Sequence, residues 1–147
     1  MGRNFLVKEK LDALGLRSYV KTSGKKGLHV VVPIVHGYTF REAREFVQQI
    51  GRLVARESEL VVTEFRRSRD PGTVFIDYLQ NSHGRTMVCP YSLRATPNAT
   101  VSTPLDWSDV DQRLKPEQFN IFSVAKIEKD PWKDLLENHQ KLEGNWK

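Results

Sequence analysis

The segment 20–33 constrains the fold most, because it joins a basic, glycine-punctuated loop to a run of β-branched residues. Gly24 and Gly27 allow a tight turn whose backbone N–H groups point at an anion, and Lys25 and Lys26 add positive charge. The loop does not match the P-loop pattern G-x-x-x-x-G-K-[ST]. It therefore predicts either a phosphate-binding loop of another kind or a solvated hairpin turn.

The residues that follow the loop predict a buried strand over 28–32, which ends at Pro33. Alternation along a strand puts His29 and Val31 on one face and the remaining apolar residues on the other. A titratable ring on a strand behind a basic loop is typical of a nucleotide site. The alternative is a histidine that is simply packed in the core.

Size and charge fit a single domain with an anionic partner. The chain has 147 residues, and its 23 Lys and Arg against 18 Asp and Glu give a formal charge of +5. A pI near 9.4 favours nucleic acid as the first candidate partner. Cys89 is the one cysteine, so no internal disulfide forms, which is typical of the cytoplasm. No stretch is long and apolar enough to span a membrane, and no signal peptide is recognised, so we expect no membrane association.

Two amphipathic helices are predicted in the first half of the chain. Apolar residues at helical spacing indicate a helix over 3–14 and a longer one over 40–56. Thr39 and Glu42 form a capping-box pattern at the start of the longer helix. A short strand is expected over 60–63.

An aspartate interrupts the apolar run 74–79, which predicts a second strand. A buried carboxylate is costly unless it is paired or binds metal. Asp77 is therefore either a functional carboxylate or half of a buried salt bridge. The loop before this strand is basic, and it predicts phosphate contacts or a solvated surface; its arginines are Arg66, Arg67 and Arg69.

The last third of the chain has weaker patterns. They predict a strand over 86–89, extended chain over 97–104 and a helix over 105–114. A helical turn is expected from 115, and a strand within 119–127. The last predicted helix covers 131–142 and turns Leu135 and Leu136 inward. Asp109 and Asp111 form a D-x-D pattern. On a helix these residues point to different sides, so we expect no shared metal ion there.

Three stretches together resemble a known family: 21–33, 75–81 and 90–105. The sequence is similar to the polymerase domain of bacterial DNA ligase D and to its stand-alone bacterial and archaeal relatives in the archaeo-eukaryotic primase superfamily. The resemblance implies one α/β (α+β) domain over 1–147, with a mixed, largely antiparallel sheet and helices packed on it. We expect the His29 and Asp77 strands to lie side by side in this sheet, with the 40–56 helix on the opposite face.

The resemblance also implies residue roles. Ser23, His29 and Arg94 match residues that hold the incoming nucleoside triphosphate, and Lys26 is expected to assist them. Asp77 matches a catalytic carboxylate that binds Mn²⁺ or Mg²⁺. Arg94 is selected by the resemblance alone, whereas the other positions also stand out by their residue type.

The sequence departs from the family at two points. The other two metal-binding carboxylates belong to an aspartate–leucine–aspartate strand ahead of the first helix, which is absent here, and Gln80 stands where many relatives have a basic residue. We therefore expect the carboxy-terminal part of a DNA end-joining polymerase, incomplete for catalysis by itself.

Such a part needs partners. A separately encoded amino-terminal half, a DNA ligase or a second copy at an open sheet edge would supply them. The alternative function is a non-catalytic basic module that binds nucleic acid or nucleotide.

Overall fold

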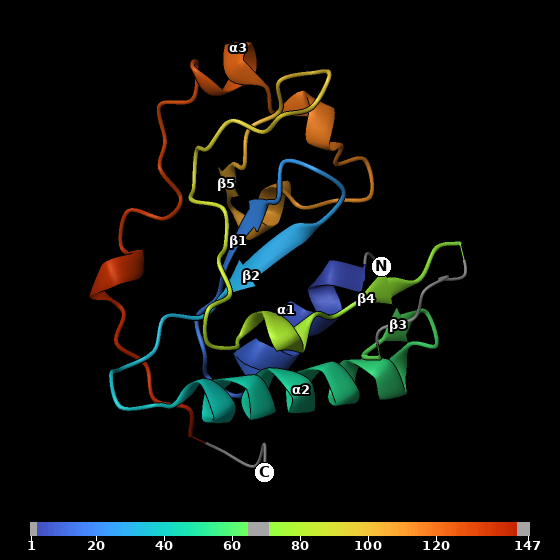
Figure 1. Ribbon diagram of the computed structural model, residues 1–147, viewed down its shortest axis with the longest axis vertical. Helices are drawn as coiled ribbons and strands as arrows, with labels where there is room; N and C mark the ends of the chain where they lie inside the picture. Colours follow the sequence, from blue (N-terminus) through green and yellow to red (C-terminus); the bar gives the residue numbers. More distant parts are fainter. Residues whose placement is uncertain (1–2, 65–70, 144–147) are drawn as a thin grey trace. The chain divides into compact units, whose positions relative to one another are not determined.

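The computed structural model describes residues 3–64 and 71–143, which are coloured along the chain in Figure 1. They fall into two compact units. One unit comprises Met1–Leu16, Ile34–Thr86 and Gln140–Lys147, and the other comprises Arg17–Pro33 and Met87–His139. We describe each unit by itself.

A three-stranded antiparallel sheet forms the centre of the second unit, and its strand order is β2-β1-β5 (Figure 1). Strand β1 spans Tyr19–Thr22, β2 spans Leu28–Val31 and β5 spans Pro104–Leu105. In the register of β1 and β2, Lys21 lies opposite His29. The expected antiparallel sheet and the strand after the basic loop are thus confirmed, whereas β1 had no counterpart among the predicted strands.

The core of this unit lies against one face of the sheet. Val20, Leu105 and Val110 are buried there. Leu28 and Val30 of β2 pack on these residues, which agrees with the predicted apolar face of the strand and leaves His29 on the other face.

Two indoles bind the backbone around β1. The Trp107 Nε1–H donates to the Ser18 carbonyl at 3.0 Å, and the Trp132 Nε1–H donates to the Val20 carbonyl at 3.0 Å. Both carbonyls are thereby satisfied away from water.

The rest of this unit is more irregular than the sequence predicted. The expected strand 86–89 has no strand structure, and the helix expected over 105–114 is only the 3₁₀ turn η2, Trp107–Asp109. The strand expected within 119–127 is wrong, because Asn120 caps the short helix α3, Ile121–Val124. The helical turn expected from 115 is present as the turn η3, Pro116–Gln118, which begins one residue later.

The predicted last helix is also wrong. It shrinks to the 3₁₀ turn η4, Leu135–Glu137, and Leu136 is 83 % exposed rather than turned inward. Asp134 precedes this turn and is bound elsewhere, by Arg17 at 2.6 Å and by the Tyr19 hydroxyl at 3.2 Å. Tertiary contacts with β1 therefore decide the backbone here, not helical periodicity.

Two helices organise the first unit. Helix α1, Arg3–Ala13, packs against α2, Phe40–Glu57, and both agree with the predicted helices within one residue at each end. Leu11 of α1 is buried, as are residues of the apolar face of α2: Phe46, Ile50 and Val54. Among the described residues, no helix has the length and apolar content to cross a membrane.

Thr39 caps α2 through the predicted capping box. Its hydroxyl accepts from the Glu42 amide at 3.2 Å, and the Glu42 carboxylate accepts from the Thr39 amide at 2.8 Å. Two backbone N–H groups at the helix start are satisfied in this way.

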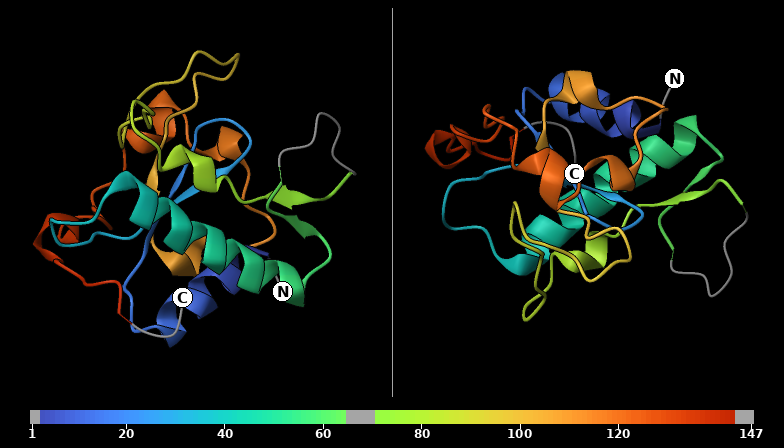
Figure 2. Two further views of the ribbon diagram at one scale, coloured as in Figure 1. Left: turned by 60° about the horizontal axis from the view of Figure 1, so that its bottom comes forward. Right: turned by 90° about the horizontal axis from the view of Figure 1, so that it is seen from above.

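A short parallel pair follows α2. Strand β3, Val61–Val62, pairs with β4, Val74–Phe75, near the end of α2 from which the chain leaves (Figure 2). The predicted strand 74–79 therefore ends at Phe75, and the 3₁₀ turn η1, Tyr78–Gln80, takes its place. Because β2 and β4 belong to different sheets, the expectation of one sheet with His29 and Asp77 on neighbouring strands is wrong.

Candidate functional site

The loop between β1 and β2 is closed by its first residue. The Ser23 amide donates to the Gly27 carbonyl at 2.9 Å, and the Ser23 Oγ accepts from the amides of Lys25 and Gly27 at 3.1 Å each. Gly24 has a φ of 74°, which a residue without a side chain adopts readily. The hydroxyl of Ser23 therefore fixes the course of the basic loop.

Arg94 lies directly against this loop. A Cβ added to Gly24 would stand 2.4 Å from the Arg94 Cγ, so the arginine stem occupies the space above the glycine. The Arg94 amide donates to the Thr100 carbonyl at 2.7 Å, and the Thr100 hydroxyl donates to the Gly24 carbonyl. The structure thus brings Arg94, which only the resemblance selected, beside the loop that holds Ser23.

Lys21 is fully buried in β1, with 0 % of its surface exposed. Its Nζ donates to the Ser102 Oγ at 2.5 Å and lies 3.1 Å from the His29 Nδ1. Burial and, to a smaller extent, the positive charge of Arg94 together lower the pKa of Lys21 to about 8.

Neither Lys21 nor Ser102 was a candidate from the sequence. The signal that could have found Lys21 is its place in the short run Tyr-Val-Lys-Thr, next to a strand-forming segment. A lysine is almost never fully buried without a specific partner. Ser102 offers no comparable signal.

His29 is half-buried on β2. Burial lowers its pKa, and the positive charges of Lys21 and Arg94 act in the same direction. The imidazole is therefore held in its neutral form near pH 7. A neutral imidazole donates one hydrogen bond and accepts one.

These side chains bring positive charge together beside the loop. The charges of Lys21 and Arg94 both act on His29, and no carboxylate in the described part of the chain pairs with either cation. Lys26 is exposed at the end of the loop and adds a further cation. A partly buried positive charge without a protein counterion favours binding of an anion such as phosphate.

Asp77 is not the buried carboxylate that the sequence predicted. It is exposed, and it precedes η1 with φ −84° and ψ 83° instead of lying within a strand. An exposed carboxylate is solvated and needs no partner, so the argument from burial cost does not apply to it. No group of three or more His, Cys, Asp and Glu that could hold a metal ion occurs among residues 3–64 and 71–143. The basic loop with Arg66, Arg67 and Arg69 lies outside the described residues.

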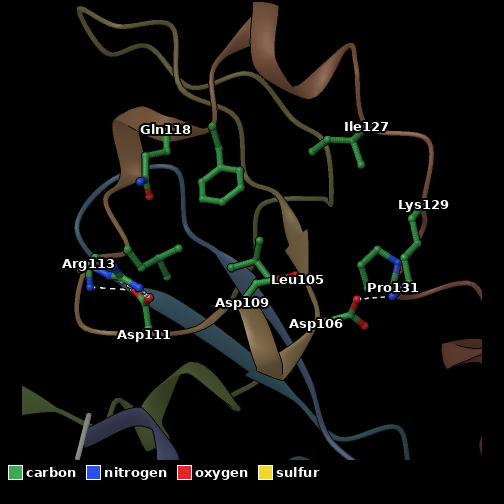
Figure 3. Close-up of a pocket in the computed structure, with 11 residues that line it drawn as sticks. Leu105, Asp106, Asp109, Asp111, Arg113, Gln118, Ile127, Lys129 and Pro131 are labelled. Carbon is green, nitrogen blue, oxygen red and sulfur yellow. Dashed lines mark hydrogen bonds and ion pairs between the residues drawn. The ribbon is translucent and has the colours of Figure 1, made fainter.

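A separate pocket of about 710 Å³ lies in the second unit (Figure 3). Asp106 pairs with Lys129 there, and Asp111 pairs with Arg113 at 3.3 Å. The D-x-D aspartates lie beside this pocket, but not on the predicted helix, because η2 ends at Asp109. None of the candidate phosphate-binding residues lines it.

Comparison with known proteins defines the family. The family model described as "LigD, primase-polymerase domain" matches residues 3–134, so the chain belongs to the LigD primase-polymerase family. The resemblance seen in the sequence is thereby confirmed.

The chain is similar to two curated bacterial proteins. It is 36 % identical over 139 residues to the bifunctional non-homologous end joining protein LigD of Bacillus subtilis. It is 35 % identical over 141 residues to the multifunctional non-homologous end joining protein LigD of Pseudomonas aeruginosa. These matches cover 91 % and 90 % of this chain but only 23 % and 16 % of the relatives.

A solved structure has the same fold. The polymerase domain from Mycobacterium tuberculosis ligase D, in complex with DNA, matches with a TM-score of 0.81 and 26 % identity. The match covers 94 % of this chain and 49 % of that chain. The expected mixed α/β fold with an antiparallel sheet is therefore confirmed.

Proposed function

We propose that this chain is the nucleotide-binding part of a polymerase that adds nucleotides to broken DNA ends during non-homologous end joining. Ser23, His29 and Arg94 hold the triphosphate of the incoming nucleotide, and Lys26 adds a cation at the rim of the loop. The observation that carries the proposal is the cluster of Lys21, His29 and Arg94 around a glycine loop, without a carboxylate partner in the described residues.

In this proposal each group has a separate part in binding. The Ser23 hydroxyl oxygen accepts hydrogen bonds from backbone amides of the loop, so the loop is preorganised before a ligand binds. Arg94 is pressed against Gly24 and supplies a planar guanidinium, which suits bidentate contacts to phosphate oxygens. His29 is neutral and donates a hydrogen bond instead of a charge.

The described residues do not by themselves fit a two-metal site. Two-metal phosphoryl transfer needs several carboxylates that bring the ions to a separation of roughly 3.5–4 Å. Asp77 supplies one exposed carboxylate. In this proposal Asp77 contributes a single ligand to Mn²⁺ or Mg²⁺, this chain alone does not catalyse nucleotide transfer, and no catalytic step is derived from its residues.

Equilibrium binding tests the proposal directly. Isothermal titration calorimetry with a ribonucleoside triphosphate, with and without Mn²⁺, would compare the wild type with three variants. His29→Ala and Arg94→Met should each weaken binding about tenfold or more, since each removes a hydrogen bond to a charged group. Asp77→Asn should remove only the gain that Mn²⁺ gives. Ser108→Ala, an exposed hydroxyl in η2, serves as the control and should bind normally.

Primer extension on gapped DNA with Mn²⁺ and ribonucleotides tests the incomplete metal site. We expect no extension by this chain alone. Extension that disappears in Asp77→Ala would contradict the proposal of incompleteness, because a full set of metal ligands would then have to come from this chain.

The same wild-type and variant proteins distinguish the proposed function from the alternative function. A basic module without a triphosphate site would bind DNA with a steep salt dependence and would be indifferent to His29→Ala and Asp77→Asn. That result would replace the proposed function. A shallow salt dependence together with loss of triphosphate binding in His29→Ala would support it.

A further inference from the structure

We infer that Lys21 is a positioning residue that fixes the tautomer of His29, so that the imidazole carries its proton on Nε2. The two residues are cross-strand partners in the register of β1 and β2. The Lys21 Nζ lies 3.1 Å from the His29 Nδ1, within hydrogen-bond distance. The tautomer itself follows from this geometry, and only its effect on triphosphate binding rests on the proposed function.

The direction of the hydrogen bond follows from the donors that are available. An ammonium group has three N–H donors and no acceptor, so it can only donate to Nδ1. A neutral imidazole that accepts at Nδ1 must carry its hydrogen on Nε2. Lys21 thus selects one of the two neutral forms of the ring.

Ser102 provides a second acceptor for the Lys21 ammonium group. The Ser102 hydroxyl donates to the Thr22 carbonyl at 2.7 Å, so its hydrogen is already used and its oxygen accepts from the Lys21 Nζ at 2.5 Å. The lysine head therefore lies between two acceptors, the Ser102 Oγ and the His29 Nδ1. Both contacts are inside the unit, where the lysine is shielded from water.

Burial of the Lys21 ammonium group costs desolvation free energy unless other groups compensate its charge. No carboxylate in the described residues pairs with it, and a methionine would fill similar space without the desolvation penalty. The acceptors at Ser102 and His29 compensate part of this charge, and an anion bound nearby would compensate more of it. The positive charge also disfavours a second proton on His29, so the ring stays a neutral donor.

The tautomer that Lys21 selects places a hydrogen on the His29 Nε2. Nε2 of His29 has no hydrogen-bond partner within the part of the chain that the structure describes. With its hydrogen fixed there, the ring presents a donor to a phosphate oxygen without waiting for a change of tautomer. Lys21 acts on the ligand through His29 and does not touch it.

Nitrogen NMR of the full chain tests the inference. Protein labelled with ¹⁵N-histidine gives one pair of ring nitrogen shifts for each of the 4 histidines, and His29→Gln identifies the pair of His29. In the wild type at about pH 7 we expect Nε2 to have the shift of a protonated nitrogen and Nδ1 that of an unprotonated nitrogen. A proton on Nδ1 in the wild type would overturn the inference, and this measurement needs no variant of Lys21.

Two lysine variants sharpen the test. In Lys21→Met the two ring shifts should move toward each other, because both neutral tautomers become populated. Lys133→Met removes an exposed lysine of the same unit and should leave the wild-type pattern. An unchanged pattern in a folded Lys21→Met protein would overturn the inference.

A serine variant separates positioning from packing. Ser102→Ala removes one of the two acceptors of the Lys21 ammonium group but keeps the contact between Lys21 and His29, so His29 should still carry its proton on Nε2. Loss of that tautomer in Ser102→Ala, with Lys21 intact, would mean that local packing and not Lys21 sets it.

Triphosphate binding then connects the inference to function. Lys21→Met should weaken triphosphate binding about tenfold, as His29→Ala does. If His29→Ala binds normally while the Nε2 tautomer is observed, the proposed function fails and the role of Lys21 stands. If His29→Ala weakens triphosphate binding but His29 of the wild type carries its proton on Nδ1, the inferred role of Lys21 fails and the proposed function stands.

Discussion

Arg94 packs so closely on Gly24 that its Cγ lies 2.4 Å from the point where a β-carbon would stand. Gly24 also has a positive φ of 74°. Gly24→Ala therefore combines an unfavourable backbone conformation with a clash, and it should lower the free energy of unfolding by about 1–2 kcal/mol. Chemical denaturation measures the loss, and calorimetric titration with triphosphate should show weaker binding because Arg94 is displaced.

Gly27→Ala is the matched control in the same loop. Apart from its two chain neighbours, no described residue has an atom within 4 Å of a Cβ added there, and the amide of residue 27 still donates to the Ser23 Oγ. Stability and binding should both stay close to those of the wild type. Equal losses in the two alanine variants would argue that the loop as a whole, and not the contact with Arg94, matters.

Ser23→Ala should affect binding more than stability. The variant leaves the amides of Lys25 and Gly27 without their acceptor, but these groups lie in an exposed loop where water replaces it. We expect a loss of about tenfold in triphosphate affinity with little change in the denaturation midpoint. Normal affinity in Ser23→Ala would contradict a preorganised loop.

The pKa of Lys21 predicts a pH-dependent stability. In the folded chain burial lowers this pKa to about 8, from an ordinary value of 10.5. Between these two values the unfolded chain binds more protons, so the free energy of unfolding rises with pH in this range. Below about pH 8 the cost of the buried charge is fully present, on the order of 3 kcal/mol.

Lys21→Met isolates this effect. Urea denaturation of both proteins at about pH 7 and about pH 10 should show the wild type gaining stability relative to the variant at the higher pH. Other titrating groups, such as Tyr19 and Tyr91, are common to both proteins and cancel in the difference. A difference that is constant with pH would mean that Lys21 is not perturbed by burial.

The capping box at Thr39 predicts a loss confined to stability. Thr39→Ala removes the acceptor for the Glu42 amide and should lower the free energy of unfolding by about 1 kcal/mol. Triphosphate binding should not change, because the candidate phosphate-binding residues belong to the other unit. Circular dichroism during denaturation measures the loss. Arg41→Ala, an exposed position in the first turn of α2, is the control.

Local sequence signals predicted the regular elements well. The helix at 40–57 has both a capping box and an apolar stripe, and the strand after Gly27 has a run of β-branched residues. Both signals act within a few residues, so one sequence is enough to recognise them. The predicted helix that ends near Leu142 failed because Arg17 and Tyr19, far away in the chain, bind Asp134 instead.

The candidate site was only partly predictable for a similar reason. The glycine loop and the strand indicate Ser23 and His29 in the sequence. Arg94 lies against Gly24 in space but far from it along the chain, so no local sequence pattern predicts this contact. Lys21 appears ordinary in the sequence, and only the pairing of β1 with β2 and the approach of Ser102 reveal its burial. The prediction that Asp77 is buried within a strand was wrong because the apolar run 74–79 is equally compatible with a strand that ends at Phe75.

The indoles of Trp107 and Trp132 give this site an optical reporter. The Trp107 indole donates to the Ser18 carbonyl, and the Trp132 indole donates to the carbonyl of Val20, which directly precedes Lys21. These are two of the 3 tryptophans of the chain. Indole emission responds to hydrogen bonding and to solvent access. Tryptophan fluorescence should therefore register a disturbance of β1, and with it of the Lys21–His29 pair, without any added label.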